Sequence, residues 1–187
     1  MDFGRHLLEG NDWHPLCHEQ DANTDITGDW VNMRDYSRAY VLMRKGGSED
    51  VDNSGLQILQ ATDNAGTGAK VLTVGRCWYK TGTMTGQGTW TRVDFSTPND
   101  FLGFGATLAG GATYATTVNA RAVADVNTNP LWLLVEILNT DLDVANGFKY
   151  ITGHLEGDNL DNSCLVTMDV FLNKSGYAGA IPLNPLT

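Results

Sequence analysis

The sequence predicts an all-β protein: an antiparallel β-sandwich, jelly-roll-like, with an extended N-terminal arm. Three observations favour this class: short apolar runs recur along the chain, turns rich in Gly, Asn and Asp separate them, and no segment has a clear helical period. Residues 56–79 show the pattern, because two apolar runs flank a polar insert at residues 62–68. Such short connections leave no room for a crossover helix, so the strands they join are antiparallel. About seven or eight strands of this kind bury their apolar faces as two packed sheets.

Length and composition indicate one globular domain. The chain has 187 residues, enough for a single substantial core, and 42% of them are apolar. Twenty-one glycines beside only five prolines are typical of a turn-rich β protein rather than a low-complexity linker. The formal net charge of −10 argues against DNA or RNA as a partner, because phosphate binding needs a basic surface.

The cysteines and the apolar runs indicate where the chain folds. Cys17, Cys77 and Cys164 are odd in number and widely spaced, which favours free thiols and a reducing compartment. We find no basic-then-apolar signal segment and no apolar run near the roughly 18 residues of a membrane span. We therefore expect the protein to be made and folded in a cytoplasm, without membrane insertion.

The first part of the chain, residues 1–35, differs from the rest. It holds three of the four histidines, Trp13, Trp30 and many acidic residues, but no strand pattern. Residues 2–8 can form one short helical turn, and the remainder is expected to be an extended, irregular arm. Such an arm needs a surface to lie against, either its own sandwich or a neighbouring subunit.

The sandwich domain is expected over residues 36–175, followed by an extended tail over residues 176–187. Apolar or alternating runs predict strands at residues 38–44, 55–60, 70–80, 90–95, 131–138, 148–156 and 164–172. The run at residues 131–138 is the most apolar and is predicted to be central and covered on both sides. Between these strands, the pattern favours a glycine-rich loop at 101–111, a strand at 113–118, a short helix at 118–125, and turns at 141–147 and 159–162.

A histidine and cysteine cluster in the arm has the chemistry of a metal site. His14, Cys17 and His18, with His6 upstream, offer the nitrogen and sulfur ligands that zinc prefers. Their spacing fits no standard zinc pattern, and no second Cys/His pair follows. The simpler interpretation is a polar arm that contains histidines, so we assign no metal and no cofactor.

Two turns also resemble ion sites in part. Asp141 and Asp143, with Asn139 and Asn146 nearby, offer oxygen ligands for calcium, but they lack the glycine and the bidentate glutamate of the calcium loop motif. An Asx-rich turn that caps backbone N–H groups is the simpler interpretation. Residues 66–70 look like a phosphate loop, but the lysine there begins a strand rather than a helix.

Signals for catalysis are weak. The sequence has no GxSxG motif, and His154 is the only histidine outside the arm. Glu136 and Glu156 are candidates for a paired-carboxylate glycosidase, although Glu136 on a central strand favours a paired or exposed carboxylate. We therefore assign no catalytic residues and expect a protein that is not an enzyme.

Five tryptophans leave a binding role open. Exposed Trp on a β-sandwich can stack on sugar rings, so a carbohydrate-binding module, lectin-like or a phage adhesion module, is the alternative function. Trp78 and Trp132 lie in apolar runs and are expected in the core. Trp13 and Trp30 lie in the arm, where large aromatic residues commonly anchor protein–protein contacts.

Two segments resemble one protein family. Residues 59–63, LQATD, followed by residues 66–72, GTGAKVL, resemble the "LxQATD…GTGAKxL" stretch of small proteins encoded beside the major capsid gene of tailed bacteriophages. Residues 141–148, DLDVANGF, resemble the same family's "ELDVDNGFD" segment, with Ala145 in place of the usual acid and Lys149 where the family often has Asp. These proteins are similar to head decoration, or cement, proteins.

The resemblance implies a jelly-roll-like structural protein of the virion. Such a protein sits on the outer capsid surface, bridges subunits of the major capsid protein and stabilises the head, after synthesis in the host cytoplasm. Repeated copies on a symmetric lattice favour self-association, so we expect a homo-oligomer, a trimer or a dimer. The acidic charge and the short apolar runs predict no direct nucleic acid contact and no membrane contact. The arm lies outside the resemblance, and its apolar residues are our candidates for capsid or subunit contact: Phe3, Leu7, Leu8, Trp13 and Trp30.

Overall fold

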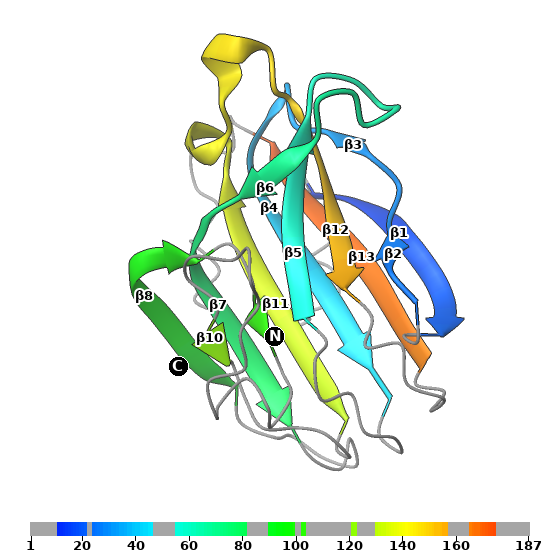
Figure 1. Ribbon diagram of the computed structural model, residues 1–187. Helices are drawn as coiled ribbons and strands as arrows, with labels where there is room; N and C mark the ends of the chain where they lie inside the picture. Colours follow the sequence, from blue (N-terminus) through cyan, green and yellow to red (C-terminus); the bar gives the residue numbers. More distant parts are fainter. Residues whose placement is uncertain are drawn as a thin grey trace.

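The protein folds as two β-sheets packed face to face, as the computed structural model shows (Figure 1). The structure describes residues 11–21, 24–46, 55–81, 90–99, 102–103, 121–122, 130–156 and 165–174. In these ranges the regular elements are strands and two short 3-10 turns, η1 (Asn139–Asp141) and η2 (Val144–Asn146). The predicted all-β sandwich is confirmed. In the described part of the chain, no helix has the length and apolar character to cross a membrane.

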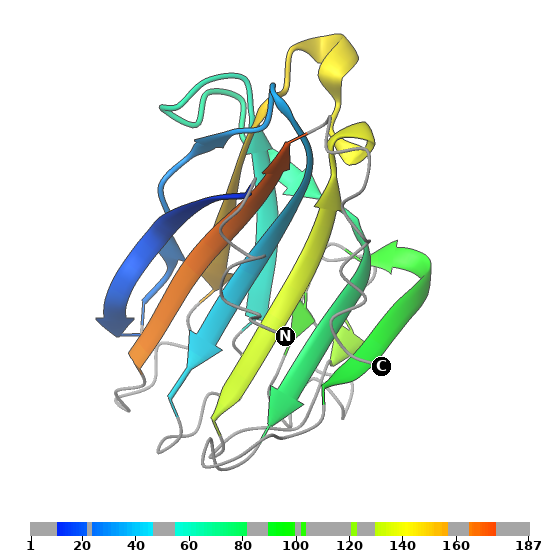
Figure 2. The same cartoon turned by 180° about the vertical axis from the view of Figure 1, so that it is seen from behind.

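The first sheet has six strands, and every neighbouring pair is antiparallel (Figure 2). Their spatial order is β1 (Asn11–Asp21), β13 (Leu165–Lys174), β4 (Tyr36–Lys45), β11 (Leu131–Leu138), β7 (Val74–Thr81) and β8 (Thr91–Asn99).

The second sheet is built around a central antiparallel pair, β5 (Gly55–Ala61) and β12 (Tyr150–Glu156). Short strands flank this pair: β9 (Leu102–Gly103) and β6 (Lys70–Leu72) pair with β5, β2 (Ile26–Thr27) and β3 (Val31–Asn32) pair with β12, and β10 (Arg121–Ala122) pairs with β9.

The strand pairing is nested in the manner of a jelly roll. β1 pairs with β13, β2 and β3 pair with β12, β4 pairs with β11, and β5 pairs with β9. The chain therefore folds as one long hairpin that wraps around the core, which is the pairing scheme of jelly-roll domains. The jelly-roll expectation is met in the described strands.

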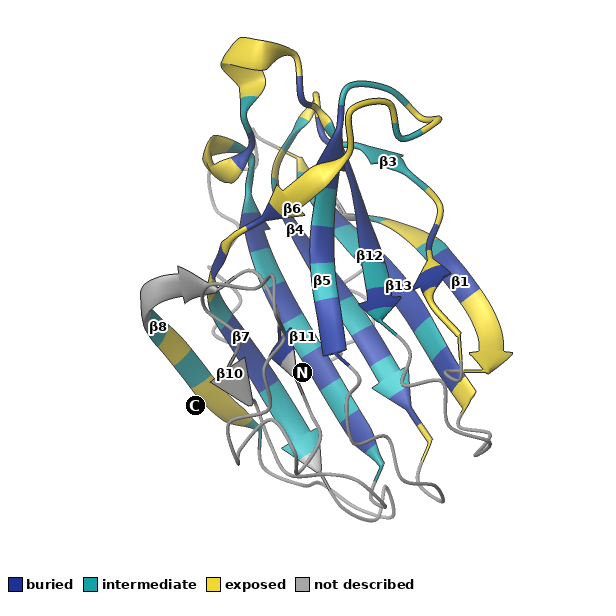
Figure 3. Ribbon diagram, in the orientation of Figure 1, coloured by how far each residue is buried: buried dark blue, intermediate teal, exposed yellow. Residues whose placement is uncertain are grey.

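The core lies between the sheets, and β11 shows how the sequence positions it. Leu131, Leu133, Val135 and Ile137 are at most 1% exposed, while the residues between them are half-buried (Figure 3). We expected β11 to be central and covered on both sides. Its central place is confirmed, but only its inner face is fully buried, because the second sheet packs against that face alone.

Two predicted elements differ in the structure. The run at residues 70–80 is two strands, because exposed Thr73 separates β6, which pairs with β5, from β7, which pairs with β11 in the other sheet. Within the helix expected at residues 118–125, Arg121 and Ala122 instead form a short parallel pairing with β9. The segments predicted at residues 113–118, 159–162 and 176–187, and most of 101–111, lie outside the described residues.

The expectation of an irregular arm without strands is wrong for residues 11–21, and also for the short strands β2 and β3 at residues 26–27 and 31–32. Residues 11–21 form β1, and Leu16 and Cys17 enter the core at 3% and 8% exposure. Register shifts between Pro15 and Cys17, and between Cys17 and Gln20, interrupt the alternation of faces. The period of two on which strand prediction depends is therefore absent from this strand. Residues 1–10, including the predicted helical turn at 2–8, lie outside the described part.

Candidate functional site

The two family-like segments form turns at the same end of the sandwich. The first turn, residues 62–69, follows β5, and the second turn, residues 139–149, precedes β12. Because Ala61 at the end of β5 lies opposite Tyr150 at the start of β12, the antiparallel pairing places the two turns side by side (Figure 1). We call this pair of turns the motif end.

Asp63 holds the first turn in shape. Its Oδ1 accepts hydrogen bonds from the backbone N–H groups of Ala65, at 2.9 Å, and Thr67, at 3.0 Å. The hydrogen bonds from Thr67, followed by those from the nearby backbone, lower the pKa of Asp63. Gly66 and Gly68 have φ of 79° and 65°, the left-handed conformation that glycine adopts without steric cost. The turn is therefore preformed and carries a negative charge.

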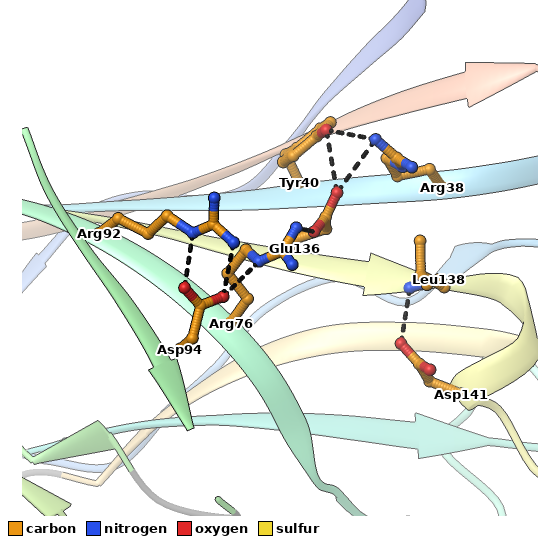
Figure 4. A network of polar contacts seen from close by, with 8 residues as sticks. All are labelled: Arg38, Tyr40, Arg76, Arg92, Asp94, Glu136, Leu138 and Asp141. Atoms are coloured by element: carbon orange, nitrogen blue, oxygen red, sulfur yellow. Dashed lines mark hydrogen bonds and ion pairs between the residues drawn. The ribbon is translucent and has the colours of Figure 1, made fainter. Parts of the chain in front are cut away.

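The second turn is also fixed by its acidic residues. Asp141 accepts a hydrogen bond from the backbone N–H of Leu138 at 2.8 Å (Figure 4). Both carboxylate oxygens of Asp143 lie 2.9 Å from the side-chain amide nitrogen of Asn146. Within this turn, Gly147 ends η2 with φ of 84°. Asp141 therefore caps a backbone N–H group, as the simpler interpretation of the calcium candidate predicted, whereas the Asp143 carboxylate binds the side chains of Asn146 and Lys70.

An ion pair joins the two turns. The Nζ of Lys70, directly after the first turn, lies 2.6 Å from the Oδ2 of Asp143 and 4.2 Å from the ring centroid of Phe148. Lys70, followed by Asn146, lowers the pKa of Asp143. Buried Gln60 adds a second link, because its Oε1 accepts the backbone N–H of Asp143 at 2.9 Å. Lys70 therefore bridges two turns, and the phosphate-loop candidate has no support in this geometry.

Trp30 packs against the first turn and borders a groove. A Cβ atom added at Gly66 would lie 2.9 Å from the Nε1 of Trp30, so the indole lies directly on the glycine backbone. The groove beside it has a volume of about 460 Å³. We call it the Trp30 groove, and its lining residues are His14, Trp30, Val31, Asn32, Asp35, Tyr36, Asn64, Tyr150 and Leu172.

A second polar cluster lies on the outer face of the first sheet, the face turned away from the second sheet (Figure 4). The Glu136 carboxylate, 9% exposed, lies 3.1 Å from Arg38 and 3.1 Å from Arg76, and it accepts a hydrogen bond from Tyr40. Asp94 pairs with Arg76 at 2.7 Å, and this bond, with the charge of Glu136, raises the pKa of Arg76. The cluster ties β4, β7, β8 and β11 together across the sheet.

The structure does not bring the predicted carboxylate pair together. Glu136 lies on β11 in the first sheet, whereas Glu156 ends β12 in the second sheet. Burial, followed by the charge of Asp25, raises the pKa of Glu156. His154 forms a hydrogen bond with the Thr27 hydroxyl at 2.8 Å. These contacts link strands of the second sheet and do not join Glu156 to Glu136.

The histidine and cysteine candidates also lie apart. Cys17 is buried, and burial raises the pKa of its thiol. His14 and His18 are exposed on β1. Among the residues that the structure describes, no three His, Cys, Asp or Glu side chains gather as metal ligands. His6 lies outside the described residues.

Of the five predicted contact residues, the structure describes two. Trp13 lies on β1 opposite Phe171 and is 52% exposed. Trp30 is half-buried at the groove, so the two tryptophans lie in different environments. Phe3, Leu7 and Leu8 lie outside the described residues. Trp78 is buried as predicted, while Trp132 is half-buried on the outer face and contacts Trp90 edge-on.

Sequence reasoning missed the contact between the turns and the groove beside them. Lys70 and Asp143 are separated by 73 residues, so their pairing depends on the fold. One signal was present in the sequence: Lys70 in the first segment and Asp143 in the second carry opposite charges. Nothing in the sequence indicated that Asn32 and Tyr36 lie beside Tyr150 in one groove, because Tyr150 is more than a hundred residues further along the chain.

Comparisons with known proteins identify no family. No protein-family model matches the sequence, and no curated protein matches it. Among solved structures, a chain from "Structure of infectious bursal disease virus Gt strain" is similar with a TM-score of 0.25 and 10% sequence identity. The match covers 89% of this chain and 42% of that chain, so this chain spans less than half of the viral chain's length. A likeness this weak carries no argument, and function must be inferred from the motif end itself.

Proposed function

We propose that this protein is a structural virion protein that binds the outer surface of a tailed-phage capsid. It bridges major capsid protein subunits there and stabilises the head. The observation that carries the proposal is the contact between the two family-like turns at the motif end, where the Nζ of Lys70 lies 2.6 Å from the Oδ2 of Asp143. Each turn alone is common turn chemistry. Their contact supports the interpretation that the two segments form one functional unit on a jelly-roll support.

The motif end has the properties of a preorganised docking surface. Asp63, Asp141 and Asp143 each hold donors of their own turn, so the turns have their shape before any partner arrives. A surface that is already ordered loses little conformational entropy on binding. The motif end also extends beyond the sheets, where a flat lattice can reach it (Figure 1).

Stabilisation of the head follows from mass action. A protein that binds the assembled shell, but not its separate subunits, shifts the equilibrium toward the assembled state. Repeated copies on a symmetric lattice also favour self-association, and we propose a trimer or a dimer. This function requires surface complementarity rather than a catalytic residue.

Co-sedimentation with purified capsids tests the proposal. The protein is expected to pellet with mature, expanded shells, to saturate them, and to raise the temperature at which they release DNA. Urea-dissociated capsid subunits serve as the control and are expected not to bind. Protein that stays in the supernatant with mature shells at a saturating dose would contradict the proposal. Sedimentation velocity of the free protein reports separately on its oligomeric state.

A further inference from the structure

We propose that the Trp30 groove is a binding site for a neutral saccharide. Its volume of about 460 Å³ lies within the range of roughly 300–1,000 Å³ that small-molecule sites occupy. The groove lies next to the motif end, because Asn64 of the first turn is part of its lining. The inference does not depend on capsid binding.

Three aromatic side chains give the groove its apolar surface. Trp30, Tyr36 and Tyr150 are all half-buried, so each side chain keeps part of its surface accessible at the groove. Aromatic rings with a polar tip suit ligands that are apolar on one face and polar at the edge. A sugar ring has this character, with C–H groups on its face and hydroxyl groups around its rim.

Neighbouring contacts fix two of these rings. The Trp30 indole lies against Gly66, where an added Cβ would be 2.9 Å from Nε1. The Tyr36 hydroxyl donates a hydrogen bond to Asp12. Because rings held in place lose little freedom on binding, the groove is preorganised for a stacked ligand.

Polar groups surround the aromatic surface. Asn64 and Asp35 are exposed, Asn32 is half-buried, and His14 is exposed on β1. Amides donate and accept hydrogen bonds, and a carboxylate accepts them. This mixture matches sugar hydroxyls, which both donate and accept.

The charge of the groove favours a neutral ligand. Its described lining includes Asp35 but no Lys or Arg. The Nζ atoms of Lys174 and Lys149 lie 5.9 Å from the ring centroids of Tyr36 and Tyr150, and Lys174 is paired with the Asp12 carboxylate at 3.3 Å. The whole chain has a net charge of −10, which repels anions. Phosphorylated or acidic sugars are therefore expected to bind more weakly than their neutral counterparts.

Saturation-transfer NMR on the full chain tests the inference directly. The probes are glucose, mannose, maltose, cellobiose and diacetylchitobiose, with glucuronate beside glucose as the acidic comparison. At least one neutral probe is expected to bind through its ring C–H protons, and the double variant D35A/N64A is expected to bind it roughly tenfold more weakly. The control E19A/Q20A removes the same two groups from exposed positions of β1 outside the groove and is expected to bind as the wild type does.

Three results would overturn the inference. The first is a wild-type protein that binds none of the neutral probes. The second is equal binding by D35A/N64A and E19A/Q20A, which would place the saccharide elsewhere. The third is that D35A/N64A abolishes capsid binding while the wild type binds no saccharide. This result would assign the groove to a protein partner. Thermal unfolding of both variants shows whether they fold. As a second measurement, the conservative variant Tyr150→Phe is expected to bind the saccharide, because its ring can still stack.

Discussion

Gly66 is the residue at which turn conformation and packing meet. Its φ of 79° is left-handed, and the Trp30 ring occupies the space that a side chain would need. Gly68 has a similar φ of 65°, but a Cβ added there would meet no atom within 4 Å. Substitution of Gly68 therefore tests backbone strain alone, whereas substitution of Gly66 adds a steric contact with Trp30.

We predict different costs for alanine at these two positions. Gly68→Ala should lose about 1–2 kcal/mol of folding free energy from strain alone. Gly66→Ala should lose about 1–3 kcal/mol more, because its Cβ forces the indole to move. Urea denaturation measures both values. Equal losses in the two variants would show that Trp30 does not pack on this turn.

Tyr36 is expected to titrate late. Its hydroxyl donates to Asp12, and this bond, with burial, raises the pKa of Tyr36 to about 12. The folded pKa lies above the usual value of about 10, so the bond stabilises the fold fully below pH 10 or so and is lost as the pH rises toward 12. Ultraviolet titration of phenolate in wild-type and Tyr36→Phe protein measures the step. If Tyr36→Phe removes a step near the ordinary tyrosine pKa instead, the bond is absent in solution.

At the scale of the element, β1 decides whether the N-terminal region belongs to the sandwich. Leu16 on this strand is 3% exposed in the core, while Trp13 on the same strand is 52% exposed. We predict that Leu16→Ala loses about 2–4 kcal/mol, because it leaves a cavity between the sheets. Trp13→Ala should change stability by less than about 1 kcal/mol. If chemical denaturation finds both variants equally stable, β1 does not pack in the core and is a detached arm.

β11 carries the carboxylate that links the strands of the outer face. Glu136 lies between Arg38 and Arg76, each at 3.1 Å, and its side chain is 9% exposed. Glu136→Gln is expected to lose about 1–3 kcal/mol, because two arginines lose their shared anion. Asp94→Asn, at a carboxylate that is 53% exposed, is the matched control and should lose less. A larger loss in Asp94→Asn would contradict this ranking.

The sequence predicted best those strands whose apolar pattern is most regular. β4, β5, β11, β12 and β13 have apolar or alternating residues throughout, and each was predicted within a few residues of its bounds. β1 was missed because two register shifts break its alternation. The break between β6 and β7 was missed because strand-like residues continue on both sides of Thr73, from Leu72 to Val74, and only tertiary pairing assigns the two strands to different sheets.

The candidate site was predicted in its parts and missed as a whole. The two turns were evident from Gly, Asn and Asp, because turn chemistry is local. Their contact was not, because Lys70 and Asp143 are 73 residues apart and meet only through the pairing of β5 with β12. The Trp30 groove was missed for the same reason, since its lining comes from several separate segments.

On the scale of the whole molecule, nested pairing explains why distant turns act together. A jelly-roll hairpin places the ends of its strands in two groups, one at each end of the sandwich. The motif end is one such group, and the Trp30 groove adjoins it. The fold therefore presents a proposed shell contact and a proposed saccharide site next to each other.

The central claim is that the two joined turns bind the shell as one unit, and charge exchange at Lys70 and Asp143 tests it most directly. Mature capsids are co-sedimented with wild type, Lys70→Asp, Asp143→Lys and the double exchange, after each variant is shown to fold by thermal unfolding. Each single exchange places like charges together and is expected to weaken shell binding. The double exchange restores an ion pair and should recover most of the binding. Single exchanges that bind like the wild type, or a double exchange that binds no better than either single one, would contradict the account.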